Sequence, residues 1–472
     1  MNRDRDNFYD DEEIDEAVQR YEEMLKTGEM IYFDVIQFEY IIDSFVEEGK
    51  LYPALKVVEL GLKQHPGSIN ILVKKAGILF NIGETSVSLK LVNDLLMIEE
   101  TNAELYLLKG SLMLVLGNSA LADVAFANAL RYSFEDREEI LFNIGFSCEQ
   151  NGKFRTAITY FSELMELNPR NDAVLYEMAY CYEKMDENYK SIEYYNKYLD
   201  IDTFSDTAWF NLGILYNKLG RHRKAVDAYE YALVINEDFP NAWFNLGNTC
   251  MIWRKYNKAI SALNKYLEFD ETNDEVYCMI GDCYIQTRNY NQAFNCFQKA
   301  LSINKNNEKA WYGSAIIMNS KKDYHAAYNY MRKALNINDK ASDYWYFMAR
   351  VCNRLNLLND TIGAFESACE QSPGKLNYWL KFAEVLHVRG MVTKAITILE
   401  SALIYHPLNS ILNYKLAAYY LESLNEKSAV KYLKKALSID FDRHVYLFES
   451  YPEARQNESV RKIISKYKKF NP

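Results

Sequence analysis

Cysteine and histidine are the side chains of this 472-residue chain best suited to act as nucleophiles, bases or metal ligands; there are eight cysteines and six histidines. No two cysteines form a CxxC pair, and the spacing of Cys278 and Cys283 fits no common metal or redox motif. The motifs GxGxxG, GxxxxGKS/T, HExxH and GxSxG do not occur, and the histidines are dispersed. The sequence therefore predicts no catalytic residue, no metal site and no cofactor.

The elements that would position any site are repeated. The stretch AWFNLG occurs at Ala208–Gly213 and again 34 residues later at Ala242–Gly247. Large side chains recur at about this step, and five of the six tryptophans fall on it. The twelve positions of this first slot are Phe38, Leu72, Tyr106, Leu141, Leu175, Trp209, Trp243, Tyr277, Trp311, Trp345, Trp379 and Asn413. A fixed period of this length predicts one small structural unit repeated along the chain.

Further slots follow the same period. A small residue stands four positions after the first slot in eleven of the twelve repeats, as at Gly213, and another stands sixteen positions after it, as at Ala225. The spacing predicts a helix on each side of a short turn, with small side chains allowing close approach. Glycines in the turn, such as Gly83, Gly117 and Gly220, predict a left-handed cap of the first helix.

These residues, in this order, resemble the tetratricopeptide repeat, a helix-turn-helix of 34 residues. The resemblance extends from about Asp34 to Arg443 and is most specific from Leu141 to Ala300. It implies an all-α, right-handed α-solenoid superhelix. We expect an acidic segment with a capping helix at 1–34, twelve repeats at 35–443 and basic capping helices at 444–472. Apolar stripes predict the caps: Ile14, Ala17, Tyr21, Met24 and Leu25 at one end, and Val460, Ile463, Ile464 and Tyr467 at the other.

The positions of the cysteines and of His387 within the repeat are explained by structure, without a chemical role. Cys148, Cys250 and Cys352 each lie seven positions after the first slot, where other repeats carry tyrosine, so we expect them in the core rather than at a redox or metal site. His387 falls on the face of a first helix turned away from its partner helix. We interpret it as a solvated or groove residue, with a ligand or catalytic base as the alternative.

In the resembling family, first helices line a concave groove that binds extended segments of other proteins. The positions one, two, five, eight and nine after the first slot are then available to a partner. The predicted groove residues are Phe142, Asn143, Phe146, Tyr176, Tyr180, Phe210, Asn211, Phe244, Asn245, Asn248, Tyr312, Tyr346 and Arg350. Asparagine can both donate to and accept from a peptide amide. Two alternatives stay open: the asparagines are ordinary repeat consensus, and the aromatics pack sideways onto the next repeat.

Charged residues are distributed unevenly along the predicted groove. Arg350, Arg354, Lys381 and Lys415 predict a basic patch late in the groove, and Glu39, Asp43 and Glu47 an acidic one at its start. They suggest a partner of mixed charge, or simply a solvated surface. The acidic and basic ends of the chain also allow weak self-association through the terminal caps, although exposed charge that keeps the ends soluble is the simpler explanation.

The sequence thus favours a protein–protein interaction scaffold or adaptor. A net charge of −11 argues against nucleic acid as a partner. No signal-peptide core and no apolar run long enough for a bilayer is found, so we expect a cytoplasmic protein without membrane contact. The alternatives are a regulatory subunit of an enzyme complex, an enzyme with its site in the groove, and an RNA-binding helical-repeat protein. Replacing Asn211 and Asn245 by alanine is expected to weaken partner binding without changing stability.

Overall fold

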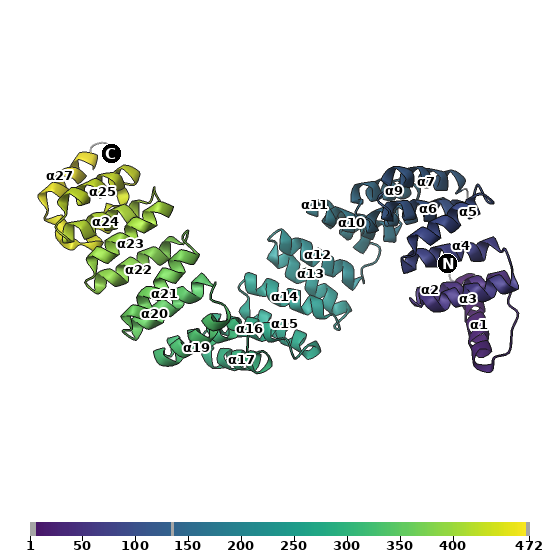
Figure 1. The fold of residues 1–472 in the computed structure, drawn as a ribbon, viewed down its shortest axis with the longest axis horizontal. Coiled ribbons are helices and arrows are strands. Elements are labelled where there is room, and N and C mark those ends of the chain that lie inside the picture. Colours follow the sequence, from purple (N-terminus) through teal and green to yellow (C-terminus); the bar gives the residue numbers. More distant parts are fainter. Residues whose placement is uncertain (1–5, 134–135, 469–472) are drawn as a thin grey trace. The chain divides into compact units, whose positions relative to one another are not determined.

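The computed structural model describes residues 6–133 and 136–468, and every regular element in these ranges is a helix (Figure 1). The chain divides into two compact units, one ending at Glu237 and the other beginning at Asp238. Within the described ranges, none of the helices combines the length and apolar character that crossing a membrane requires.

The helices of the first unit are α1 (Asp6–Thr27), α2 (Val35–Glu47), α3 (Leu51–Gln64), α4 (Ile69–Ile82), α5 (Thr85–Leu96), α6 (Ala103–Val115), α7 (Ser119–Tyr132), α8 (Arg137–Gln150), α9 (Phe154–Leu167), α10 (Asp172–Lys184), α11 (Asn188–Leu199), α12 (Asp206–Lys218) and α13 (His222–Ile235). Those of the second unit are α14 (Pro240–Ile252), α15 (Tyr256–Phe269), α16 (Asp274–Gln286), α17 (Tyr290–Ile303), α18 (Glu308–Ser320), α19 (Tyr324–Ile337), α20 (Ser342–Arg354), α21 (Leu358–Gln371), α22 (Leu376–Val388), α23 (Val392–Tyr405), α24 (Ser410–Glu422), α25 (Glu426–Ile439), η1 (Asp442–His444), α26 (Val445–Ser450), η2 (Pro452–Arg455) and α27 (Glu458–Lys468).

Each unit is a stack of antiparallel helix pairs. From α2 onward, every even-numbered helix up to α24 packs against the odd-numbered helix that follows it, and within each unit the pairs then pack against one another (Figure 1). We call the even-numbered member of each pair the first helix and the other the second helix. The predicted all-α repeat architecture is confirmed, with twelve such pairs in the described chain.

The small slot works as the spacing predicted. A Cβ atom on Gly110, Gly145 or Gly213 would lie within 2.2–2.4 Å of a ring carbon on the second helix of the same pair. The rings belong to Phe126, Phe161 and Tyr229. A buried ring on the second helix therefore lies directly on the backbone of the first, which only a residue without a side chain allows.

The predicted left-handed turn is present, and it does not depend on glycine. Gly83, Gly117, Gly152 and Gly220 have φ between 69° and 94°. At Gly83 the following amide donates to Leu79 O, which satisfies the free carbonyl at the helix end. The same slot holds other residues, with φ between 59° and 65°, in six repeats: Asp186, Arg254, Arg288, Lys322, Asn356 and Leu424. For these residues the conformation costs about 1–2 kcal/mol, which helix packing must offset.

Tryptophan in the first slot ties each first helix to the loop before it. Trp209 Nε1 donates to Thr203 O at 3.0 Å, and Trp311 and Trp379 donate to the carbonyl six residues earlier in the same way. The face buried in α12 consists of Ala208, Leu212, Gly213 and Leu215, while Trp209 stays half-buried. The expectation that the first slot belongs to the fully packed face therefore fails at Trp209. It is confirmed at five other positions of the slot, which are buried: Phe38, Leu141, Leu175, Trp379 and Asn413.

The end helices cover the stack as their apolar stripes predicted, with one exception. Ala17, Tyr21 and Met24 of α1 are buried with α2 and α3, and Val460 of α27 is buried against the last pairs. Leu25 is 63% exposed, so its assignment to the packed stripe was wrong. The exact limits of the capping segments at 34 and 443 stay a prediction.

Replacing Gly213 by alanine tests the contact between paired helices. We expect a loss of about 1–3 kcal/mol in the free energy of unfolding, because the new methyl group overlaps the buried Tyr229 ring. Gly77→Ala, in the middle of α4 with no atom within 4 Å of the new Cβ, is the matched control and should gain up to about 1 kcal/mol. Denaturant unfolding followed by circular dichroism measures both. Equal effects of the two substitutions would contradict the argument.

Candidate functional site

Four of the predicted groove aromatics pack on the second helix of their own pair. Phe142, Tyr176, Phe210 and Phe244 are all half-buried. Their ring-centroid distances are 6.0 Å to Phe161, 5.4 Å to Tyr195, 5.8 Å to Tyr229 and 5.5 Å to Tyr266 respectively. One side of each ring thus packs against the second helix of its own pair, and the rest of the ring stays accessible to solvent.

The remaining aromatics at this position contact the next repeat. Tyr312 stacks on Tyr344 and Tyr346 stacks on Tyr378, each with ring centroids 4.4 Å apart. The alternative of sideways packing is therefore confirmed for these two side chains. Tyr414, at the equivalent position of α24, is fully buried and its hydroxyl donates to Asp440 O at 2.6 Å, so it is not a surface residue.

The asparagines differ in what they contact. Asn211 Nδ2 donates to Tyr176 Oη at 3.0 Å and to Tyr195 Oη at 3.1 Å. Its amide donors are thus already satisfied inside the unit, which corrects the expectation that Asn211 is free for a partner. The half-buried side chains of Asn143, Asn245 and Asn248 form no hydrogen bond to any part of the chain that the structure describes.

Asn211→Ala is therefore expected to lower stability. The substitution leaves the hydroxyl of the fully buried Tyr195 without its partner, which costs about 1–3 kcal/mol. Asn143→Ala, at the equivalent position of α8, removes no such bond and should stay within about 0.5 kcal/mol of the wild type. Thermal and denaturant unfolding of the two variants measures the difference, and a stable Asn211→Ala protein would refute the structural role.

A cavity of about 270 Å³ opens on the first helices of the first unit. Its lining comes from α2, α4, α6 and α8 and includes the predicted residues Asn143 and Phe146, the latter 40% exposed. Lys74 Nζ lies 2.8 Å from Asp43 Oδ1 in its wall. Restricted hydration in the cavity raises the pKa of Glu104. This site thus offers apolar surface with a few polar groups, as small binding sites usually do.

Two neighbouring carboxyl groups on first helices, those of Glu149 and Glu177, have raised pKa values. Glu149 of α8 is buried, and removal from water together with the neighbouring Glu177 carboxylate raises its pKa from 4.5 to about 8. The pKa of Glu177 is raised as well, chiefly by removal from water. Cys181 Sγ donates to Glu149 Oε2 at 3.6 Å. Glu177 occupies the asparagine position of its repeat, so a carboxyl side chain with a raised pKa interrupts the asparagines there.

This pair makes the stability of the first unit depend on pH. The folded state holds a proton that the unfolded state releases above pH 4.5, so stability declines as pH rises from there to about 8. Glu149→Gln keeps a donor toward Glu177 and removes the titration, so its melting temperature should exceed that of the wild type increasingly across this range. Glu166→Gln, on an exposed carboxyl, is the control. Parallel pH profiles for all three proteins would contradict the assignment.

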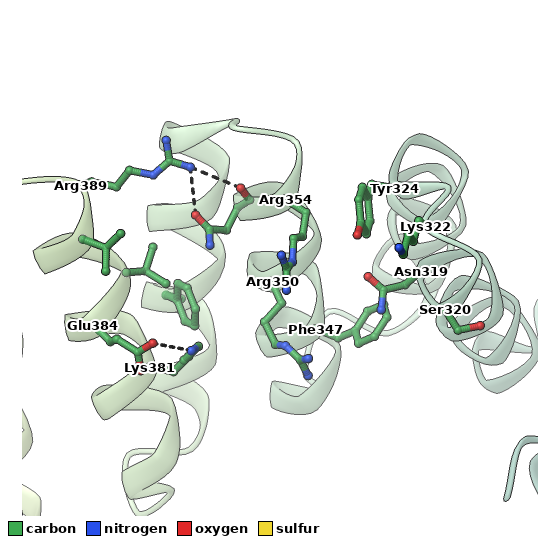
Figure 2. Close-up of a pocket in the computed structure, with 14 residues that line it drawn as sticks. Asn319, Ser320, Lys322, Tyr324, Phe347, Arg350, Arg354, Lys381, Glu384 and Arg389 are labelled. Atoms are coloured by element: carbon green, nitrogen blue, oxygen red, sulfur yellow. Dashed lines mark hydrogen bonds and ion pairs between the residues drawn. The ribbon is translucent and has the colours of Figure 1, made fainter. Parts of the chain in front are cut away.

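A larger cavity of about 510 Å³ lies on α18, α20 and α22 in the second unit (Figure 2). Arg350 and Arg354 project from α20, and Lys381 and Glu384 from α22. The basic patch predicted from Arg350, Arg354 and Lys381 is thus brought together in one cavity. Lys415 does not line it, and removal from water lowers the pKa of that lysine.

Tyr180 lies near a further cation, since Lys184 Nζ is 4.6 Å from its ring centroid. This arrangement is typical of a cation–π contact on one helix face.

The cysteines carry no sign of nucleophilic chemistry. All eight are free thiols, and Cys148, Cys250 and Cys352 are buried as the repeat predicted. Burial raises the pKa of Cys148 and of Cys352 to about 12, which suppresses the reactive thiolate. Among the described residues, His, Cys, Asp and Glu side chains form no cluster of three that could hold a metal ion.

His387 has partners on the next repeat. Its Nε2 lies 2.6 Å from Glu422 Oε2, and its ring stacks on Tyr419 with centroids 4.3 Å apart. The side chain is therefore half-buried between two first helices, so of the two positions that the sequence allowed, solvated or in the groove, the solvated one is wrong.

Comparison with known families identifies five consecutive repeats in this chain. The tetratricopeptide repeat model matches residues 138–171, 173–204, 207–239, 240–273 and 274–307. The helix pairs before and after these ranges have the same fold without such a match. No curated protein sequence matches the chain.

Solved structures with related folds share little sequence with it. YrrB, described as a TPR protein with an unusual peptide-binding site, is 20% identical over 38% of this chain and 92% of its own, with a TM-score of 0.35. A chain of the APC/C hetero-tetramer Cut9–Hcn1 is 16% identical over 92% of this chain and 94% of its own, with a TM-score of 0.38. The C-terminal part of a TPR repeat-containing protein from Cytophaga hutchinsonii is 16% identical over 50% of this chain and 97% of its own, with a TM-score of 0.44.

Proposed function

Because this chain is a tetratricopeptide repeat protein, we propose that it is an interaction scaffold whose first helices bind extended segments of partner proteins. One observation carries the proposal. In each unit a cavity is lined by side chains of successive first helices, entirely so from α2 to α8 in the first unit and for the most part from α18 to α22 in the second. An extended segment can follow such a row because each repeat offers similar positions at a regular spacing.

The accessible side chains define the proposed contacts. Asn143, Asn245 and Asn248 have amide groups left over for a partner's backbone, and Phe146 and Arg350 have exposed ends. Each amide pair contributes about 0.5–1.5 kcal/mol, a magnitude similar to the cost of ordering one partner side chain. Burial of apolar surface against Phe146 and the half-buried rings therefore dominates the affinity.

The contribution of the other predicted groove residues is largely structural. Tyr312 and Tyr346 join neighbouring repeats, and Asn211 joins two tyrosines. In the proposed scaffold these side chains shape the floor of the surface, and a partner contacts only their free edges.

Position-specific crosslinking tests this function. A photoreactive phenylalanine analogue is placed at Phe146 or Arg350 on first helices and, as matched controls, at Val124 of α7 or Arg332 of α19 on exposed second-helix positions. With the full chain in its own cell extract, crosslinks to partner polypeptides are expected from the first-helix positions and not from the controls. Crosslinks from the second-helix positions alone, or from neither set, would mean that the first helices do not bind partners.

A further inference from the structure

The cavity on α18, α20 and α22 has a large excess of positive charge. Five cationic side chains line it, Lys322, Arg350, Arg354, Lys381 and Arg389, together with a single carboxylate, Glu384. Glu384 Oε1 binds Lys381 Nζ at 2.7 Å, and this pair is marked in Figure 2. Counting one negative against five positive groups gives the lining a net charge of +4 in a chain whose own net charge is −11.

Most of these cations have no internal counter-ion. Arg389 donates to the oxygens of Asn353 and to Asn356 Oδ1 at 2.8 Å, which are neutral acceptors. In the part of the chain that the structure describes, Lys322, Arg350 and Arg354 have no carboxylate within ion-pair distance. Like charges held together on one concave surface repel one another unless an anion binds among them.

The rest of the lining is mixed, with Asn319, Ser320, Tyr324 and Asn353 beside four apolar side chains. Phe347, Phe365 and Val385 are buried in the wall, and Val388 is 77% exposed at its edge. A ligand that satisfies the cavity therefore brings negative charge together with an apolar group. Arg350 and Arg354 are one helical turn apart on the same face of α20, which suits bidentate binding of successive carboxylates.

We propose that this cavity selects a partner segment rich in aspartate and glutamate that carries an apolar side chain between its acidic residues. The inference rests on the proposed function, since it specifies the chemistry of a partner segment at one of the first-helix surfaces. Cations contributed by three consecutive repeats match several carboxylates along a chain better than one phosphate group. A long polyanion such as RNA extends beyond the cavity onto a chain with a net charge of −11, which repels it, whereas a short acidic segment fits within the basic lining.

A defined probe tests the proposal on the full chain. The probe is a fluorescein-labelled peptide with blocked ends and the sequence Glu-Glu-Leu-Asp-Glu-Leu-Glu-Glu, and its binding is followed by fluorescence anisotropy. Its amide analogue has glutamine and asparagine in place of the acids. We expect the affinity of this analogue to be lower by about tenfold or more. Raising the salt concentration from about 0.1 M to about 1 M should weaken binding of the acidic probe, because the Debye length falls from about 10 Å to about 3 Å.

Matched charge variants locate the binding. Arg350→Gln with Arg354→Gln should weaken the acidic probe about tenfold or more, since two carboxylate-binding groups are lost. Arg332→Gln with Lys340→Gln removes the same charge from exposed positions on α19 and the loop after it, and should leave the affinity within about twofold. Circular dichroism confirms that both variants are folded.

Three results would overturn the inference: equal binding of the acidic and amide probes, equal losses in the two double variants, or tighter binding of inorganic phosphate or an oligouridylate than of the acidic peptide. If crosslinking from Phe146 still captures partners in that case, the scaffold function stands and only the acidic specificity is wrong. If the acidic probe binds at Arg350 and Arg354 but no first-helix crosslink forms, the cavity is an anion site and the scaffold function is wrong.

Discussion

The contact between a small residue on each first helix and a large side chain on its partner helix is the constraint on which the other packing depends. At Gly213 the ring of Tyr229 lies where a Cβ atom would stand, and the same arrangement holds at Gly110 and Gly145. Because the two helices approach so closely, a pair behaves as one flat unit with two faces. Each face is apolar, so a pair is stable only when it stacks on the next.

Stacking determines which side chains remain for a partner. A first helix packs on its own second helix and also on neighbouring first helices, so only a narrow strip of its surface is free. Tyr312 and Tyr346 lie on this strip, yet one face of each ring packs on the next repeat. The amide of Asn211 donates a hydrogen bond to Tyr195. Structural and binding roles therefore share the same helix face, and individual side chains divide between them according to their nearest neighbours.

Electrostatics follows from the same geometry. Burial among the first helices removes carboxyl groups from water, which raises the pKa values of Glu104, Glu149 and Glu177. On α20 and α22 the stacking of repeats brings cations from separate helix pairs into one cavity. Residues that lie 31 or more positions apart in the chain, such as Arg350 and Lys381, become one site because the repeat places equivalent positions side by side.

The sequence alone determined the helix pairs, their period, the small slot, the buried cysteines and most of the capping stripes, because each of these is a local pattern repeated many times. It also found Arg350, Arg354, Asn143 and Phe146 as accessible residues, since position within a helix fixes which way a side chain points. Only the tertiary structure decided that Asn211 is satisfied internally, that Tyr414 is buried and that Leu25 is exposed. It alone also showed that residues such as Leu424 adopt the left-handed turn. These outcomes depend on contacts with other repeats, and the pattern of one repeat carries no information about the particular side chain that its neighbour presents.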